Sequence, residues 1–333
     1  MALVFVTREL PGTAVGRLAI EHTVNVWPGP KAPERAQLLA AAGTVEGLLC
    51  MLAERIDAEL LDAAPKLRAI ANLAVGTDNI DLAECERRGI AVGNTPDVLV
   101  EATADLTFGL LLAAARGIAK ANADVRAGRW RTWEPRGWLG HAVAGGTLGI
   151  VGPGSIGRAV ARRAAGFGME VIASGRDGED PPSPLREAFY LGGSRFEIEI
   201  PMVPLKRLLE RSDFVSLHCP LSEATRRLIG REQLDAMKET AILINTARGE
   251  VIDPDALREA LMGGAIAGAA LDVTDPEPLP ASHPLLEAPN LLVTPHIGSA
   301  THRAREAMVD LAVENLREAL AGRPMPNGVR NDR

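Results

Sequence analysis

The stretch Thr147-Leu-Gly-Ile-Val-Gly-Pro-Gly-Ser-Ile-Gly157 decides the fold of this chain. Its apolar first half predicts a short strand, and its glycine-rich second half runs directly into an Ala/Arg-rich stretch of helical period. We expect Gly152 to form a tight turn, Gly154 to let the backbone approach a pyrophosphate, and Gly157 to let helix and strand touch. GxGxxG alone could be a flexible loop. In this strand–turn–helix setting it predicts a dinucleotide site.

Strand-like and helix-like segments alternate on both sides of this motif, which favours an α/β fold with doubly wound parallel sheets. Several of the strand candidates are almost wholly apolar, as expected of parallel strands that are covered on both faces. The candidates are Leu3–Val6, Gly47–Cys50, Arg68–Ala71, Thr147–Val151, Val171–Ala173, Phe214–Leu217, Ala241–Ile244, Ala267–Leu271 and Leu291–Val293.

The position of the motif in mid-chain predicts a discontinuous domain. A long helix over Val100–Ala127 and a Trp/Gly/Arg-rich loop precede the motif, and a final helix over Thr301–Leu320 is too short to form a domain. We therefore expect a substrate domain from residues 1–98 and 294–333, and a dinucleotide-binding domain from residues 99–293. Two domains in sequence are the alternative.

Composition excludes several classes of protein. The chain has 333 residues, 47% of them apolar, and a net charge of −7, which argues against a nucleic-acid or membrane surface. Its three cysteines are widely spaced and indicate neither a disulfide framework nor a metal site. The N-terminus lacks the features of a signal peptide, and the apolar stretch Leu106–Ala115 is typical of a buried helix. We expect a soluble, cytoplasmic protein.

The end of the strand after the motif bears on the choice of dinucleotide. An NAD site normally has an acidic residue there to bind the adenosine ribose, but this strand ends in Ser174-Gly175-Arg176. Ser174 and Arg176 suit a 2′-phosphate, so we expect NADP(H) to be preferred. Asp177 leaves NAD(H) possible.

Three segments that follow strands in the second half could supply carbonyl-reduction chemistry. Arg248 has the planar fork that binds a carboxylate, Glu277 lies in a proline-flanked loop, and His296 follows the last strand. Separately, they could be a surface ion pair, a loop carboxylate and a structural histidine. Together, at strand ends downstream of a dinucleotide motif, they predict a site that reduces a 2-oxo acid.

The chain also resembles a known family over nearly its whole length. The resemblance is carried by the motifs above and by Asn72–Asn79, Asn94–Val98, Glu101–Asp105 and Ser212–Leu221. It is similar to the D-isomer-specific 2-hydroxyacid dehydrogenases, and most similar to their glyoxylate/hydroxypyruvate reductase branch. This resemblance implies two Rossmann-like domains with the active site in the cleft between them, and a homodimer.

By the same resemblance, His296 would donate the proton to the substrate, Glu277 would orient the His296 imidazole, and Arg248 would bind the substrate carboxylate. Trp138 matches an aromatic residue that can reach the substrate pocket of the partner subunit, although an interface core residue is an equal alternative. Further substrate contacts would come from Val75, Gly76 and Ser299. Cofactor contacts would come from Thr103, Gly152, Gly154, Ser155, Ile156, Gly157, Ser174, Arg176, Pro220, Thr246 and Asp272.

The implied reaction is direct hydride transfer that reduces glyoxylate or hydroxypyruvate to the D-2-hydroxy acid. Two alternatives remain open: a dinucleotide-sensing protein like the corepressor relatives of the family, and a dehydrogenase with another substrate such as 3-phosphoglycerate. The stretch Gly178–Pro204 is longer and richer in proline than is usual in the family. It could alter the adenosine side of the site.

Overall fold

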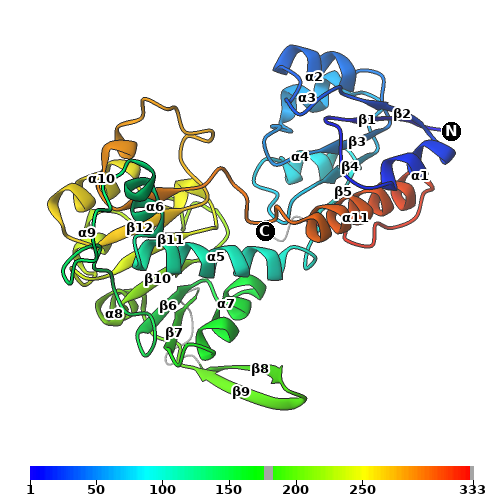
Figure 1. The fold of residues 1–333 in the computed structure, drawn as a ribbon. Coiled ribbons are helices and arrows are strands. Elements are labelled where there is room, and N and C mark those ends of the chain that lie inside the picture. Colours follow the sequence, from blue (N-terminus) through cyan, green and yellow to red (C-terminus); the bar gives the residue numbers. More distant parts are fainter. Residues whose placement is uncertain (176–182, 331–333) are drawn as a thin grey trace. The chain divides into compact units, whose positions relative to one another are not determined.

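The computed structural model describes residues 1–175 and 183–330. The chain divides into two compact units: unit 1 is Met1–Leu99 with Ser299–Arg333, and unit 2 is Val100–Gly298. Each unit is built on its own parallel sheet with helices on both faces (Figure 1). This α/β architecture with two doubly wound sheets confirms the predicted fold class.

Unit 1 has a five-stranded parallel sheet covered by helices on both faces. Helices α1 (Ala14–Glu21) and α11 (His302–Leu320) pack against each other, and α11 lies on β3 (Gly47–Cys50) and β4 (Ala69–Asn72). Side chains of α2 (Arg35–Ala42), α3 (Ala58–Ala63) and α4 (Leu82–Arg87) bury the other face. The strand order is β2 (Thr23–Val26), β1 (Leu3–Val6), β3 (Gly47–Cys50), β4 (Ala69–Asn72) and β5 (Ala91–Gly93).

Unit 2 has a six-stranded parallel sheet and two separate apolar cores, one on each face. Helices α5 (Val100–Ala115) and α7 (Ser155–Ala165) bury one face. The other face is covered by α8 (Leu205–Arg211), α9 (Arg231–Asp235) and α10 (Pro254–Gly263). The strand order is β13 (Leu291–Val293), β12 (Gly268–Leu271), β11 (Ile242–Asn245), β10 (Phe214–Leu217), β6 (Thr147–Val151) and β7 (Glu170–Ser174).

The register of this sheet determines where its loops lie. Leu217 of β10 pairs with Val151 of β6 and with Asn245 of β11, and Asn245 pairs with Leu271 of β12. These residues are the last of their strands, so the four strands end level with one another. The loops after β6, β10, β11 and β12 therefore meet at one edge, where ligands bind in such sheets.

The predicted strands are present, with ends that differ by one or two residues, and the structure adds strands that the sequence did not predict. Burial accounts for the missed strand β2: β3, β4, β10, β11 and β12 are buried at every residue, whereas β2 at the sheet edge has no buried residue. Strand β2 therefore lacks the apolar run that marks a central parallel strand.

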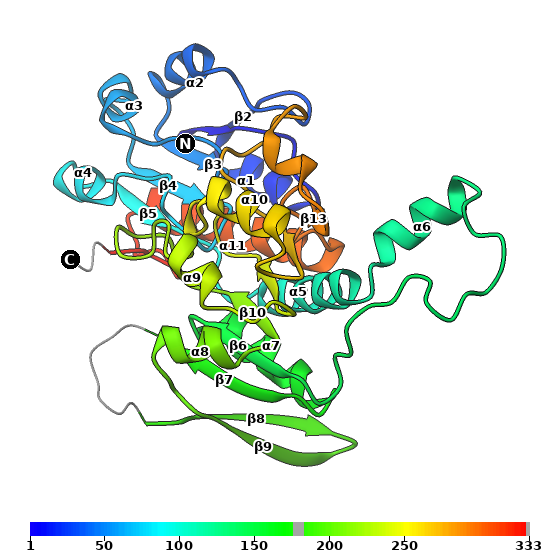
Figure 2. The same ribbon diagram turned by 90° about the vertical axis from the view of Figure 1, so that its left-hand side faces the viewer.

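The prediction of one helix over Val100–Ala127 was wrong. Gly117 adopts a left-handed backbone (φ +57°), which ends α5 and starts α6 (Ile118–Arg126) at a bend of 62°. Helix α6 and the loop after it project from the rest of unit 2 (Figure 2). Within the described residues, no single helix is long and apolar enough to cross a membrane, and α5 with α6 meets that criterion only as this bent pair.

An antiparallel hairpin follows β7, in the stretch that the sequence marked as unusually long. Strands β8 (Leu185–Leu191) and β9 (Ser194–Ile200) pair along their whole length. Leu185, Ile198 and Ile200 face the apolar core beneath α7, and the chain then returns to the main sheet, where Met202 bridges Ala173. The hairpin therefore lies beside the end of β7.

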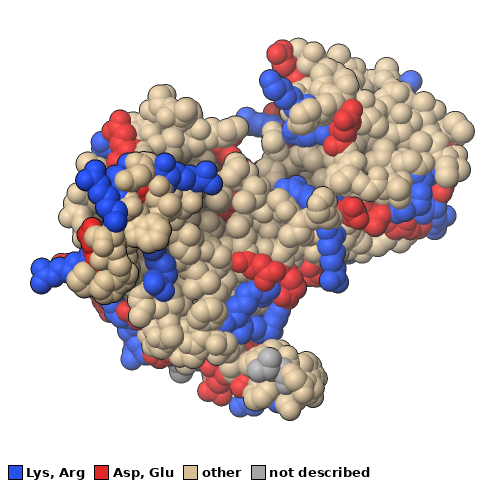
Figure 3. Space-filling view, viewed as in Figure 1, with Lys and Arg blue, Asp and Glu red and all other residues tan. Residues whose placement is uncertain are grey.

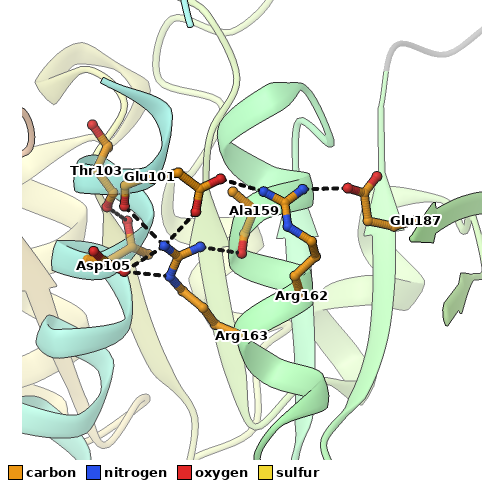
Figure 4. A network of polar contacts seen from close by, with 8 residues as sticks. Glu101, Thr103, Asp105, Ala159, Arg162, Arg163 and Glu187 are labelled. Atoms are coloured by element: carbon orange, nitrogen blue, oxygen red, sulfur yellow. Dashed lines mark hydrogen bonds and ion pairs between the residues drawn. The ribbon is translucent and has the colours of Figure 1, made fainter. Parts of the chain in front are cut away.

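An ion-pair network links the hairpin, α7 and α5 (Figure 4). Arg162 pairs with Glu187 of β8 and with Glu101 of α5, and Arg163 pairs with Glu101 and Asp105. Acidic and basic side chains accordingly gather where these elements meet (Figure 3). The network links α7, the helix that starts directly after Gly154 of the glycine motif, to its neighbours on both sides.

The second junction between the units falls after Gly298, not after residue 293 as expected from the sequence. Hydrogen bonds explain this shift. The Thr294 and His296 N–H groups donate to Leu271 O and Asp272 O, and the Gly298 N–H donates to the Asp272 carboxylate. Residues 294–298 are thus bonded to the loop after β12.

Candidate active site

The glycine-rich turn has the geometry that a dinucleotide pyrophosphate requires. Gly152 has φ +87°, and a Cβ atom there would lie 2.5 Å from Cys219 N. A Cβ at Gly157 would lie 2.7 Å from Gly152 O, whereas a Cβ at Gly154 would meet nothing within 4 Å. Two glycines therefore allow close packing, and the third leaves open space at the N-terminus of α7. The residues fit a bound dinucleotide.

Other predicted cofactor residues lie at the ends of neighbouring elements of unit 2. Ser174 ends β7 and is buried, and its carbonyl accepts from Gly152 N–H at 2.8 Å. Thr246 follows β11, and its hydroxyl lies 2.9 Å from that of Thr107 on α5. Pro220 is exposed after β10. Arg176 lies outside the described residues.

Asp272 fixes the loop that carries His296. Its Oδ1 accepts from Thr294 Oγ1 at 2.6 Å and from Ile297 N at 2.8 Å, and its Oδ2 accepts from Gly298 N at 2.7 Å. Both carboxylate oxygens of this buried residue are therefore used by one loop. Thr103 of α5 adjoins the same place, because a Cβ at Gly298 would lie 3.4 Å from Thr103 Oγ1.

Arg248 is presented by a tightly held loop after β11. The buried Asn245 side chain donates to Arg248 O at 2.8 Å and accepts from Ala247 N at 3.0 Å. The next residue is Gly249, where a Cβ would lie 2.0 Å from the carbonyl of Thr274. Only glycine allows this contact, so the Arg248 loop and the Glu277 loop are packed backbone to backbone.

His296 and Glu277 form a direct hydrogen-bonded pair. The distance from His296 Nδ1 to Glu277 Oε1 is 2.6 Å, and both side chains are partly exposed, at 25% and 33%. His296 also has a left-handed backbone (φ +53°), which is uncommon for a residue other than glycine and occurs at functional sites. The bond to Glu277 thus occupies Nδ1 of the imidazole, and Nε2 is the ring nitrogen that can contact a ligand.

The electrostatics of Glu277 connect all three predicted catalytic residues. Burial acts to raise the pKa of Glu277, but the hydrogen bond and charge of His296, the Thr274 N–H and the charge of Arg248 outweigh it. The pKa of Glu277 therefore lies below its ordinary value, and this carboxylate is ionised at neutral pH. The structure thus brings Arg248, Glu277 and His296 into one electrostatic cluster in unit 2.

The predicted substrate contacts Val75, Gly76 and Ser299 belong to unit 1. Val75 and Gly76 lie in the loop after β4, and Val75 is 39% exposed. Trp138 lies in unit 2, where its indole N–H donates to Asp124 Oδ2 of α6 at 2.7 Å. This bond ties the exposed loop back to α6.

The sequence did not predict two features of the site. Asn94 donates from its side chain to Val75 O at 2.7 Å and so supports the loop after β4. His218 follows β10, and its Nε2 lies 2.8 Å from Ser216 Oγ; burial lowers the pKa of His218 to about 3, so it is neutral. The Asn-Thr-Pro motif could have indicated Asn94, but no signal in the sequence specified its partner.

Together, the fold and the cluster define a dinucleotide-binding protein of the dehydrogenase type. Residues 108–298 match the family model described as D-isomer specific 2-hydroxyacid dehydrogenase, NAD binding domain. The chain belongs to this family, as its sequence motifs predicted.

Individual relatives agree with this assignment. The chain is 46% identical over 330 residues to a glyoxylate reductase of Korarchaeum cryptofilum (strain OPF8), a match that covers 99% of this chain and 96% of that protein. The crystal structure of the TT0316 protein from Thermus thermophilus matches with a TM-score of 0.88 and 48% identity, covering 98% and 99% of the two chains. An NADPH-dependent glyoxylate/hydroxypyruvate reductase from Sinorhizobium meliloti, in complex with NADP and malonate, matches with a TM-score of 0.81 and 31% identity, covering 98% and 96%.

Proposed function

We propose that this protein reduces the keto group of a small 2-oxo acid of the glyoxylate or hydroxypyruvate type, giving the D-2-hydroxy acid. The observation that carries the proposal is the 2.6 Å bond between His296 Nδ1 and Glu277 Oε1, within the electrostatic reach of Arg248. An acid, its anionic partner and a cation are the groups that such a reduction needs.

His296 is the proton donor in this proposal. Glu277 accepts a hydrogen bond from Nδ1, which fixes the orientation of the ring. Nε2 then donates the proton to the carbonyl oxygen of the substrate as that oxygen gains negative charge. Because Glu277 stays ionised at neutral pH, it remains an acceptor for the Nδ1–H group.

Arg248 binds the substrate carboxylate. Its guanidinium can hold two carboxylate oxygens at once, and the Asn245 bonds fix the backbone from which it extends. The N–H groups of Val75 and Gly76 add further donors, and Ser299 adds another substrate contact. Trp138 would reach the substrate pocket of the partner subunit or lie in the interface between subunits. Such positioning accounts for a large part of the rate gain in reactions of this kind.

The glycine-rich turn and the ends of β7, β10, β11 and β12 hold the cofactor, a nicotinamide dinucleotide. When bound in its reduced form, this group supplies the hydride. Thr103 and Asp272, which both lie beside Gly298 in the His296 loop, would contact its nicotinamide end.

NADPH is the preferred form in this proposal. Strand β7 ends at Ser174, and the next two residues, Gly175 and Arg176, carry no carboxylate. The Sinorhizobium relative is also named as NADPH-dependent. The catalytic efficiency with NADPH should exceed that with NADH by more than tenfold, and Arg176→Ala should abolish the difference. Equal use of the two cofactors by the wild-type protein would refute the preference.

A homodimer is the proposed assembly. No residue of α6, a helix described in full, is buried, and large apolar side chains are exposed on it and on the loop that follows. A surface of this kind marks a protein–protein interface. These side chains are Ile118, Val125, Trp130, Trp133 and Leu139. Light scattering should give twice the chain mass for the wild type, and the monomer mass for a Trp133→Glu/Leu139→Glu variant.

A substrate panel tests the proposed activity. Glyoxylate, hydroxypyruvate and pyruvate are each assayed with NADPH and NADH. 3-Phosphoglycerate, which is already a hydroxy acid, is assayed in the oxidative direction with NADP+ and NAD+. We expect the highest kcat/KM for glyoxylate or hydroxypyruvate. Turnover of 3-phosphoglycerate alone would instead favour another dehydrogenase, and dinucleotide binding without turnover would favour a sensing protein.

A further inference from the structure

The loop after β4 is held in one conformation by donors that occupy its carbonyl groups. Thr95 N–H donates to Ala74 O at 2.9 Å, Asn94 Nδ2 to Val75 O at 2.7 Å, and Asn72 Nδ2 to Gly76 O at 2.9 Å. Three consecutive carbonyl oxygens are therefore bonded to unit 1.

The N–H groups of the same loop are in a different situation. Within the described part of unit 1, neither Val75 N–H nor Gly76 N–H makes a hydrogen bond, and Val75 is 39% exposed. Because a peptide plane directs its C=O and N–H in opposite senses, fixing the carbonyls also fixes the direction of the neighbouring donors. This is the arrangement that an anion-binding loop requires.

Asn94 is itself anchored from a distant part of the sequence. Its backbone N–H donates to Asn327 O at 3.1 Å, and its carbonyl accepts from Asn315 Nδ2 at 2.9 Å. Asn315 lies on α11 and is fully buried, and its Oδ1 accepts from Asn327 N at 3.0 Å. Both backbone groups of Asn94 are thus held by α11 and the segment after it.

Gly93 makes this arrangement possible. A Cβ atom at Gly93 would lie 2.8 Å from Asn315 Nδ2 and 2.7 Å from Met325 Sδ, so a larger residue would displace both. The segment after α11 also pairs with β5, since Val329 N–H donates to Val92 O at 2.8 Å. The C-terminal segment is therefore part of the support for the loop.

We propose that Asn94 is a positioning residue for substrate binding: held by Asn315 and Asn327, its side-chain amide fixes Val75 so that the Val75 and Gly76 N–H groups point at the substrate carboxylate. The inference rests on the proposed function, because it takes the loop after β4 to be the carboxylate-binding loop. It adds a chain of contacts from α11 and the C-terminal segment to that loop.

Two substitutions separate the donated hydrogen bond from simple packing. Asn94→Ala removes the side-chain amide. Asn94→Asp keeps the shape but replaces the donor by a carboxylate that repels the Val75 carbonyl. Asn25→Ala is the matched control, because Asn25 is an exposed asparagine on β2 of the same unit.

Steady-state kinetics with glyoxylate and NADPH give the main readout. We expect the KM for glyoxylate to rise about tenfold in Asn94→Ala and further in Asn94→Asp, the scale of one lost hydrogen bond. The kcat and the KM for NADPH should stay within about twofold of wild type, and Asn25→Ala should match wild type. A substitution that only loosened the fold would lower the melting temperature and change both KM values.

Binding of oxamate, a non-reducible 2-oxo acid analogue, keeps the test independent of turnover. Calorimetry on the NADPH-loaded protein should show the same order of affinities: wild type, then Asn94→Ala, then Asn94→Asp. If the wild type reduces glyoxylate but both Asn94 variants keep its KM for glyoxylate and its oxamate affinity, the inference is wrong and the proposed function stands. No turnover and no oxamate binding by the wild type would overturn both.

Discussion

Glu277 Oε1 lies 2.6 Å from His296 Nδ1, and the two residues come from loops that follow different strands, β12 and β13. The Glu277 loop is held by the backbone contact at Gly249, and the His296 loop is held by Asp272. The pair is therefore fixed from both sides before any substrate binds. This preorganisation is what a proton donor needs to act at the moment of reduction.

Glu277→Gln tests the role of the negative charge. Glutamine keeps the size and an acceptor oxygen, but it does not stabilise the protonated imidazole by charge. We expect kcat for glyoxylate reduction to fall tenfold or more, with the KM for NADPH unchanged. A kcat within about twofold of wild type would contradict the assignment of Glu277.

The lowered pKa of Glu277 also predicts the sign of a stability effect. A carboxyl group with a depressed pKa in the folded state stabilises the protein above its ordinary pKa of 4.5, and that contribution is lost as the pH falls through the folded-state value. Wild type should therefore exceed Glu277→Gln in unfolding free energy at pH 7, and the difference should disappear in acid. Denaturation curves from pH 3 to pH 7 measure it; a difference that grew toward low pH would have the wrong sign.

Gly249→Ala tests the contact between the catalytic loops. The added Cβ would lie 2.0 Å from Thr274 C and O, so one loop must move. We expect a loss of about 1–3 kcal/mol in unfolding free energy, and a fall in kcat/KM of tenfold or more because Arg248 and Glu277 shift together. Gly263→Ala is the control, since a Cβ there meets nothing within 4 Å. Equal behaviour of the two variants would show that the contact does not matter.

Glu187→Gln tests whether the hairpin supports the cofactor site. Glu187 is largely buried and pairs with Arg158 and Arg162 of α7, the helix that starts at the glycine-rich turn. Losing both ion pairs should raise the KM for NADPH about threefold to fivefold and leave kcat unchanged, with a smaller effect at high salt. Glu199→Gln, at an exposed position of the hairpin, should leave the KM for NADPH as in wild type. The same change in both variants would rule out a specific role for Glu187.

Much of the fold could be predicted because buried parallel strands have a simple signature. The central strands β3, β4, β10, β11 and β12 are short apolar runs, and each was expected within one or two residues of its observed position. Strand β2 was missed because it is an edge strand with exposed side chains. The hairpin β8–β9 was missed because its alternating charged and apolar residues lack the apolar run of a buried strand, and the stretch was marked only as unusually long and rich in proline.

The site divides in a similar way. Gly152, Gly157, Arg248, Glu277 and His296 could be proposed as site residues from local motifs, because each follows a strand at the same kind of sheet edge. The residues that hold these side chains in place could not be predicted, because their role depends on contacts between residues far apart in the sequence. Asn315, for example, reaches Asn94 across 221 positions of sequence. The break at Gly117 was missed because an isolated glycine does not reveal its backbone conformation.

Steady-state turnover of glyoxylate with NADPH by wild type and by His296→Asn is the most direct test of the central claim. Asparagine fits the space but cannot deliver the proton, so we predict a kcat at least a hundredfold lower than wild type, with NADPH binding retained. A His296→Asn protein that kept most of the wild-type kcat would contradict the account, because the reaction would then not depend on the imidazole that Glu277 holds in place.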